Sequence, residues 1–216
     1  MNPKLRNLSA VIADFVPGCE QEERDRELML RFLRDNDNCL MRENLTAHFT
    51  ASSWIVNGAD SRIADDELNG RAGDSESADA KGSMNTGDNK FLMVYHNLYD
   101  SWSWTGGHAD GEADLLSVAI REAREETGVQ DFKIPRREPI SLEIITVDGH
   151  MKRGVYVPSH LHLNLTYLLQ ADETQKLSVK PDENSGVAWI PAGELASHVS
   201  EPWMMKWVYE KLMGRV

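Results

Sequence analysis

Three glutamates near the middle of the chain share one face of an expected helix. Residues 115–127 carry a helical pattern of apolar and charged positions, and Gly128 ends it. With about 100° of rotation per residue, Glu122, Glu125 and Glu126 fall within one sector of roughly 100°. Like charges at these spacings repel, and the last turns of a helix favour cations over anions. The pattern therefore predicts a missing positive charge, and carboxylate oxygens on a rigid face suit Mg²⁺ or Mn²⁺.

The alternative interpretation is a solvated, salt-bridged helix face. The Arg-Glu-Ala-Arg-Glu-Glu run at residues 121–126, taken alone, is more often such a surface than a metal site. An apolar stripe adjoins the acids, made by Leu116, Ala119, Ile120 and Ala123. This stripe predicts that the helix lies against a sheet with its acids along the border of a cleft.

The elements that must position this helix are mostly strands. Periodicity and turn-forming residues predict helices at 21–36 and about 202–212, and strands at 46–57, 91–95, 102–104, 141–147, 160–170 and 186–190. A glycine loop is expected between the strand at 102–104 and the acidic helix. This mixture favours an α/β fold in which helices cover both faces of a mixed sheet.

The length and composition favour a single domain. We expect one core over residues 1–216, preceded by a helical extension at about 1–45. Residues 58–89 hold eight acids against three bases and have few larger aliphatic side chains. Such a stretch cannot bury enough apolar surface to offset its ordering entropy, so it is predicted to be a flexible acidic insertion between two strands.

Charge and hydropathy exclude several classes of function. The net charge of −12 repels phosphate backbones, so long nucleic acid is not an expected partner. No apolar run reaches the roughly 18 residues of a membrane span, and no signal peptide is evident, so we expect a cytoplasmic protein without a membrane partner. Cys19 and Cys39 stand in no metal-binding spacing, and two idle thiols are favoured over a disulfide. The binding of an anionic substrate would therefore require a cation.

The stretch from Gly107 to Val129 resembles the Nudix box. That box reads Gly, five residues, Glu, seven residues, Arg-Glu, an aliphatic residue, any residue, Glu-Glu, any residue, Gly and an aliphatic residue. The matching positions after the first glycine are Arg121, Glu122, Ala123 as a small apolar residue, Glu125, Glu126, Gly128 and Val129. Ala113 stands where the box has its first Glu. The loop at 106–111 is similar to a subset of Nudix proteins that carry Gly-Gly-His-x-Asp-Gly.

The resemblance implies a Nudix-like α/β/α sandwich with a mixed β-sheet and a site for Mg²⁺ (or Mn²⁺). The metal ligands that it implies are the Gly106 carbonyl, Glu122, Glu125 and Glu126. The implied activity is hydrolysis of a diphosphate linkage in a nucleoside diphosphate derivative or a related small nucleotide-like molecule. Arg121 is expected to reach Glu125 and hold the acids in place, while Glu122 or Glu183 takes a proton from water. For Glu183, which lies in the loop at 180–185, a solvated loop carboxylate is the open alternative.

Residues outside the acidic helix are candidates for substrate contact. His108 follows the two glycines, where it could touch a phosphate or, as favoured here, fix the loop by a hydrogen bond. Tyr99 lies shortly before this loop. His160 and His162 alternate with leucines, so both point to one strand face that could line the pocket, and we do not expect either to bind a metal.

Two rival functions remain open. The replacement at Ala113 motivates a non-catalytic nucleotide-binding or sensor module of the same fold, against which the intact Glu122, Glu125 and Glu126 argue. An isoprenoid-diphosphate isomerase of the same fold would require a cysteine in its pocket, but both cysteines of this chain precede the expected core.

Overall fold

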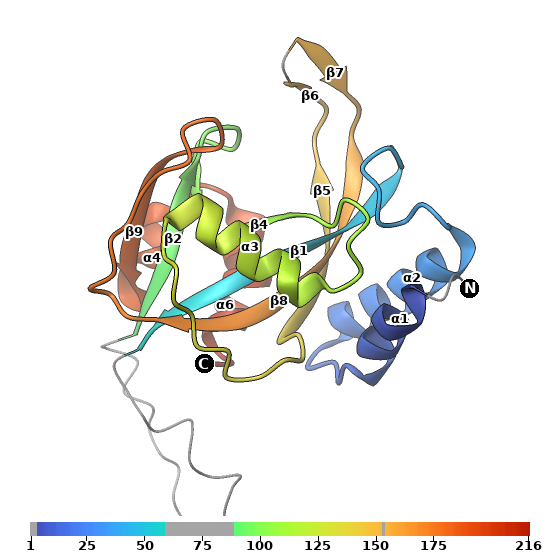
Figure 1. The fold of residues 1–216 in the computed structure, drawn as a ribbon, viewed down its shortest axis with the longest axis horizontal. Coiled ribbons are helices and arrows are strands. Elements are labelled where there is room, and N and C mark those ends of the chain that lie inside the picture. Colours follow the sequence, from blue (N-terminus) through green and yellow to red (C-terminus); the bar gives the residue numbers. More distant parts are fainter. Residues whose placement is uncertain (1–3, 59–88, 153) are drawn as a thin grey trace, which may run out of the picture.

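The computed structural model describes residues 4–58, 89–152 and 154–216, and a mixed sheet lies at its centre (Figure 1). The strands of this sheet are β1 (Ala47–Asn57), β2 (Lys90–His96), β3 (Ser101–Ser103), β4 (Thr105–His108), β5 (Ser141–Val147), β8 (His160–Ala171) and β9 (Asn184–Pro191). Strands β6 (His150–Lys152) and β7 (Val155–Val157) form a separate hairpin that projects from the sheet (Figure 1). The longer helices are α1 (Leu5–Asp14), α2 (Glu20–Asp35) and α3 (Leu115–Thr127).

The C-terminal part of the chain is built from short helical segments. These are a 3₁₀ turn (Ala192–Glu194), α4 (Leu195–His198), α5 (Pro202–Met204), a π-helical turn (Met205–Tyr209) and α6 (Glu210–Met213). Met204, Val208 and Leu212 are buried, so the last three segments present one apolar stripe to the sheet. None of the helices in the described ranges has the length and hydropathy that crossing a membrane requires.

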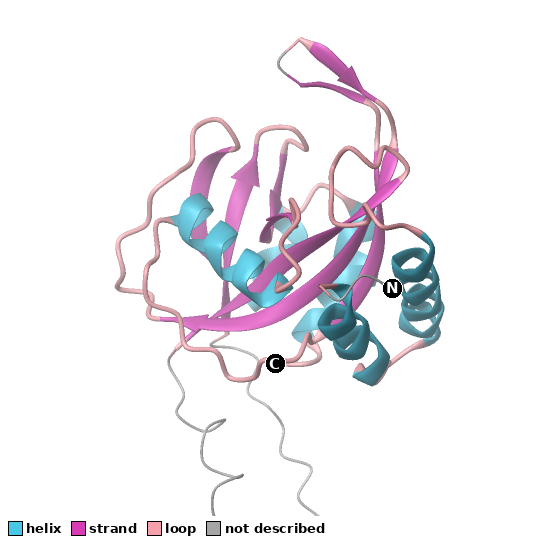
Figure 2. Ribbon diagram, turned by 45° about the vertical axis from the view of Figure 1, so that its right-hand side comes forward, coloured by secondary structure: helices cyan, strands magenta, loops and turns pink. Residues whose placement is uncertain are grey.

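The strands are ordered β3-β2-β1-β8-β5, with β4 also paired to β1 and β9 to β2. Among these described strands, β1 and β8 run parallel and the other neighbours run antiparallel. Helix α3 crosses one face of the sheet, while the C-terminal helices cover the other face (Figures 1 and 2). The predicted mixed sheet between two helical layers is confirmed.

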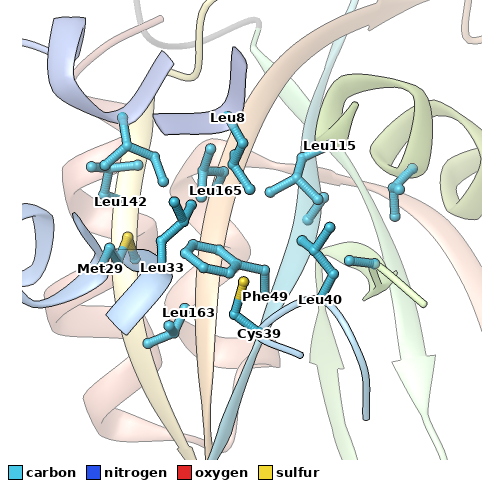
Figure 3. Close-up of a cluster of buried hydrophobic side chains, with 14 of the residues drawn as sticks. Leu8, Met29, Leu33, Cys39, Leu40, Phe49, Leu115, Leu142, Leu163 and Leu165 are labelled. Carbon is cyan, nitrogen blue, oxygen red and sulfur yellow. The ribbon is translucent and has the colours of Figure 1, made fainter. Parts of the chain in front are cut away.

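The parallel register determines which side chains share a face. Phe49 and Ala51 of β1 lie opposite Leu163 and Leu165 of β8. These side chains pack with α1, α2 and the start of α3, including Leu115, in one apolar core (Figure 3). Because side chains alternate along a strand, the residues between them face the C-terminal helices instead.

Helix α2 covers the edge of β5, the last strand of the sheet. Gln21 donates a hydrogen bond to the Leu142 carbonyl (3.1 Å), and the Ile144 amide donates to Asp25 (2.9 Å). Unpaired edge groups invite pairing with other chains, so these contacts satisfy and cover an otherwise open edge.

A buried ion-pair network joins α2 to the C-terminus. Glu22 is fully buried and accepts hydrogen bonds from Arg215 (2.7 Å) and Ser141 (2.8 Å), with Lys211 at 3.2 Å. Burial alone would raise the pKa of Glu22, but the bonds from Arg215 and the Gly18 amide and the charge of Lys211 outweigh it and lower that pKa to about 2. Ion pairs thus hold helix α2 against the C-terminal segment.

Some elements differ from those expected. Helix α1 lies within the expected helical extension, but its bounds were not predicted. Leu5, Leu8 and Ile12 bury one stripe of it, whereas no side chain caps its start, so the usual signal is missing. The expected glycine loop begins as strand β4, because β1 pairs with it over Thr105–His108. Of the predicted acidic insertion, residues 59–88 lie outside the described residues.

We predict that Glu22→Gln lowers the free energy of unfolding by about 3 kcal/mol at pH 7, since it breaks a buried ion pair. The depressed pKa also means that Glu22 stabilises the fold above about pH 4.5, and that this stabilisation is lost as the pH falls towards 2. Urea titrations across this range should therefore show a shallower pH dependence for the variant.

The matched control is Glu20→Gln in the same helix, where the side chain is 83% exposed and lies 3.8 Å from Arg24. This control should change stability by less than about 0.5 kcal/mol. Equal losses in the two variants would contradict the assigned role of the buried network.

Candidate metal-binding and catalytic site

Helix α3 has local signals at both ends. Asp114 caps its start by accepting hydrogen bonds from the Ser117 amide (3.3 Å) and hydroxyl (2.7 Å). Gly128 ends it in the left-handed conformation (φ 78°), and its amide donates to the Arg124 carbonyl (2.9 Å). The bounds of α3 therefore agree with those expected, and its acids lie in the last two turns.

Strand β4 brings two glycines against these acids. Gly106 and Gly107 pair with Ser52 and Ala51 of β1. The carboxyl group of Glu122 lies so close to Gly107 that a Cβ there would overlap it. The Gly106 amide donates a hydrogen bond to Glu126 (3.3 Å). The absence of a side chain at Gly107 allows the helix and the strand to approach, while its absence at Gly106 makes room for Ser52 and Ala51 of β1.

Three carboxylates converge at this point. One oxygen each of Glu122, Glu126 and Glu183 lies within 4.8 Å of the others. The side chain of Glu122 is 13% exposed and Glu126 is 4% exposed, so both are largely removed from water. Glu183 arrives on the loop before β9, and its side chain is 42% exposed. Glu183 could be a solvated loop carboxylate or part of the site, and its position beside Glu122 and Glu126 favours the second interpretation.

Asn184 fastens the Glu183 loop to α3. Its buried amide group donates a hydrogen bond to the Glu126 carbonyl (3.0 Å) and accepts one from the Lys180 amide (3.1 Å). The next residue towards the N-terminus is Glu183, so this bridge sets where the third carboxylate lies. The sequence carried no signal for Asn184, because its partner is 58 residues away.

The electrostatics of the cluster favour a bound cation. Burial raises the pKa of Glu126 well above the ordinary value, and the charges of Glu122 and Glu183 raise it further, against the opposing hydrogen bond from Gly106. Carboxylate oxygens grouped in this way are the ligand set that Mg²⁺ and Mn²⁺ prefer. The residues present thus fit a divalent cation, with Glu122 and Glu126 as the best-placed protein ligands.

Glu125 lies apart from these three carboxylates, although we expected it to bind the metal with them. Its side chain is 45% exposed and contacts Lys180 (2.9 Å), which also contacts Glu183 (3.0 Å). Burial opposes the charge of Lys180, but its bonds to Glu125 and Glu183 raise its pKa. Lys180 therefore supplies part of the missing positive charge. It lies on a loop far from α3 in the sequence, so the helical pattern could not predict this contact.

Arg121 stabilises the site through a nearer partner than expected. It donates a hydrogen bond to Glu122 at 2.7 Å, whereas its distance to Glu125, the predicted partner, is 3.9 Å. Since Glu122 is the acid that faces Gly107, this contact orients a cluster carboxylate directly.

Tyr99 lies beside the loop of Glu183. The turn that carries it is held there because the Asn97 amide donates to the Glu183 carbonyl (3.0 Å). The Tyr99 ring is 39% exposed and lies 4.5 Å from the His96 ring. Burial lowers the pKa of His96, although the charge of Glu183 opposes this shift. His96 is therefore a neighbour of the cluster, and the sequence pattern did not predict it.

The other predicted substrate residues gather elsewhere. His108, His160 and His162 surround His48, and one ring nitrogen of each of the four lies within 4.8 Å of the others. They form a second group, distinct from the three carboxylates. His48 was missed because its position opposite His162 depends on the parallel register of β1 and β8.

Comparison with known proteins places these features in a wider context. The NUDIX domain family matches residues 83–212. A binary complex of an Ap4A hydrolase from C. elegans is 15% identical, with 77% of this chain and 96% of that chain covered and a TM-score of 0.46. A NUDIX-family hydrolase from Clostridium perfringens is 18% identical (78% and 98% covered, TM-score 0.47). The E. coli dihydroneopterin triphosphate pyrophosphohydrolase is 12% identical (78% and 96% covered, TM-score 0.46). A search of curated sequences found no match.

We predict that Glu126→Gln stabilises the metal-free protein by roughly 1 kcal/mol, because it removes a desolvated charge from among like charges while still accepting the Gly106 hydrogen bond. A carboxylate with a raised pKa stabilises the fold most below about pH 4.5 and loses that contribution as the pH rises, so the gain should grow with pH. The same variant should weaken Mn²⁺ binding. Thermal unfolding and calorimetric titration test both effects.

Glu125→Gln is the control on the same helix. Its exposed pairs with Lys180 and Arg121 contribute little, so its stability should change by less than about 0.5 kcal/mol and its Mn²⁺ affinity should fall less. A larger loss of Mn²⁺ affinity in Glu125→Gln than in Glu126→Gln would show that the ion binds elsewhere on the helix.

Proposed function

This chain belongs to the NUDIX family, and from that premise we propose that it is a pyrophosphohydrolase that uses Mg²⁺ or Mn²⁺ to cleave a diphosphate linkage in a nucleoside diphosphate derivative. The observation that carries this proposal is the convergence of Glu122, Glu126 and Glu183 beside two glycines. Grouped carboxylates repel a diphosphate unless a cation lies between them, so binding and hydrolysis depend on the same ion.

We assign the cation to Glu122, Glu126 and the Gly106 carbonyl. When bound, such an ion neutralises diphosphate charge and lowers the pKa of a coordinated water. Glu122 is kept in place by Arg121, and Glu126 by the Gly106 amide. These contacts pre-organise the ligands, so little reorganisation is required when substrate arrives.

Glu183 is the carboxylate that we assign to proton transfer. It is the most exposed of the three, at 42% against 13% for Glu122 and 4% for Glu126, so water reaches it most readily. Lys180, 3.0 Å away, and the Asn184 bridge position it. Its role is to accept the proton of the attacking water as the new P–O bond forms and the bridging P–O bond breaks, which releases the leaving group as the second phosphate-containing product.

A nucleotide-like substrate suits the surface beside this loop. Tyr99 and His96 present neighbouring rings next to Glu183, and aromatic rings of this kind stack on a base. The net charge of −12 disfavours long nucleic acid, which leaves a small molecule whose few phosphates one site can neutralise.

A sensor module of the same fold is the second candidate. Ala113 replaces the first acid of the box, and the adjacent Glu112 accepts a hydrogen bond from the Asp114 amide (2.9 Å) rather than joining the cluster. One acid is therefore absent from the usual set. Binding of a nucleotide without turnover would favour this function over hydrolysis.

We expect Mg²⁺-dependent release of a phosphate-containing product from at least one member of a panel of nucleoside triphosphates, sugar nucleotides, dinucleoside polyphosphates and coenzymes. Glu122→Gln and Glu126→Gln should each lower kcat/KM by roughly 1,000-fold, because both remove charge from the cation site. Chromatographic separation of products measures the rates.

The control for charge alone is Glu138→Gln, whose side chain is 70% exposed and remote from the cluster contacts. Its kcat/KM should stay within about twofold of the parent value. Tight nucleotide binding with no turnover under any metal condition would overturn the hydrolase proposal.

If Glu183 accepts the proton, its replacement should affect kcat and the pH profile more than metal affinity. Glu183→Gln should lower kcat by roughly 100-fold or more and abolish the acid limb of its pH profile, with the Mn²⁺ affinity changed less than in Glu126→Gln. An acid limb that persists in Glu183→Gln and disappears in Glu122→Gln would assign the proton transfer to Glu122 instead.

A further inference from the structure

Four histidines from three strands meet on the sheet face opposite α3. His48 and His162 are paired across the parallel strands β1 and β8, while His108 comes from β4 and His160 from the start of β8. Five of their ring-to-ring separations fall between 4.9 and 5.1 Å. The carboxylates of the proposed hydrolytic site belong to another group.

Hydrogen bonds fix the ring nitrogens that remain available. Nδ1 of His48 lies 3.1 Å from the Asn44 carbonyl, and Nδ1 of His160 lies 2.9 Å from the Pro158 carbonyl. A carbonyl only accepts, so each Nδ1 carries the hydrogen and each Nε2 keeps a lone pair. A backbone carbonyl on the second nitrogen is the usual outer contact of a histidine that binds a metal.

One of these nitrogens has no partner, and two others face each other. Nε2 of His48 is buried and makes no hydrogen bond within the described residues. Nε2 of His160 lies 3.2 Å from Nε2 of His162. That separation matches the edge of a tetrahedron with Zn–N bonds of 2.0–2.1 Å, which is about 3.3 Å.

We propose that His48, His108, His160 and His162 form a binding site for a late first-row transition-metal ion, of which Zn²⁺ fits the closed four-nitrogen set best. Imidazole nitrogen suits Zn²⁺ and its neighbours, whereas Mg²⁺ prefers oxygen, so this site and the carboxylate cluster select different ions.

The role of such an ion is to hold three strands in register. β4, which carries His108, also carries the glycines that receive Glu122 and Glu126, and β1 lies between β4 and β8. Bound Zn²⁺ therefore fastens the strand on which the acidic cluster rests. The proposal departs from the expectation that His160 and His162 contact substrate and do not bind a metal, because it gives both a structural role instead.

The test uses the full chain without a histidine tag, stripped by a chelator and titrated with Co²⁺ and then with Zn²⁺. We expect one equivalent of Co²⁺ with the visible absorption of tetrahedral nitrogen coordination, its displacement by Zn²⁺, and a rise in the unfolding midpoint of about 5 °C or more at saturating Zn²⁺. An excess of Mg²⁺ should not displace the Co²⁺.

Two variants test the ligands, and two others serve as controls. His162→Gln and the partly exposed His160→Gln should each weaken Co²⁺ binding by at least about 100-fold, while circular dichroism reports whether each has folded. His198→Gln is the control, since His198 lies outside the cluster and bonds the Glu194 carbonyl of its own turn. Glu126→Gln should keep the Co²⁺ spectrum, which separates this site from the hydrolytic one.

The proposal is overturned if stripped parent protein shows no stoichiometric Co²⁺ or Zn²⁺ binding, since that result does not depend on any variant. It is also overturned if binding survives in both His160→Gln and His162→Gln. In either case the close contact of His160 and His162 is a hydrogen bond between a ring N–H and a ring nitrogen, and the cluster is a packing feature of the sheet.

Discussion

The repulsion among Glu122, Glu126 and Glu183 is the constraint on which the arrangement of the site depends. Removing carboxylates from water and setting them within 4.8 Å of one another costs free energy unless each is held and the charge is compensated. Arg121 and Lys180 supply compensation from the rim, and backbone amides supply it from within. The repulsion that remains destabilises the empty cluster, and the same repulsion would be relieved by a divalent cation of the kind proposed above.

The sheet separates two kinds of chemistry on its two faces. On the α3 face, Phe49 and its neighbours form an apolar core, and the acids lie at its border. On the opposite face, the same strands carry a buried polar row in which Asn164 bonds Thr50 (3.0 Å) and Ser52 (2.9 Å), next to the histidine cluster. Because the two faces share their backbone, a shift of β1 by one residue would exchange the apolar and polar rows and break up the histidine cluster.

Local patterns in the sequence predicted much of the fold and part of the site. Helix α3 and strand β5 occupy the predicted residues, because periodicity, an Asp cap and a C-terminal glycine act over a few positions. The acids of the helix were recognised for the same reason. The contacts that separate their roles were not, since Lys180 meets Glu125 across 55 residues and Asn184 meets Glu126 across 58. The histidine cluster could not be predicted from the sequence, because it depends on a parallel pairing in which partners have no fixed spacing along the chain.

The parallel pairing of β1 with β8 also determines when the sheet can be completed during synthesis. Thr50 and Asn164, which face each other across β1 and β8, are 114 residues apart, an interval that a ribosome covers in on the order of ten seconds. Throughout that interval one side of β1 has no partner strand, and the acidic helix, already synthesised, has no completed sheet to rest on. A nascent chain with this topology is exposed to association through its open strand, and its carboxylate cluster is incomplete until the loop of Glu183 has emerged. Assembly of the carboxylate cluster is therefore limited by translation and chain closure, and it is completed only when the last quarter of the chain has folded.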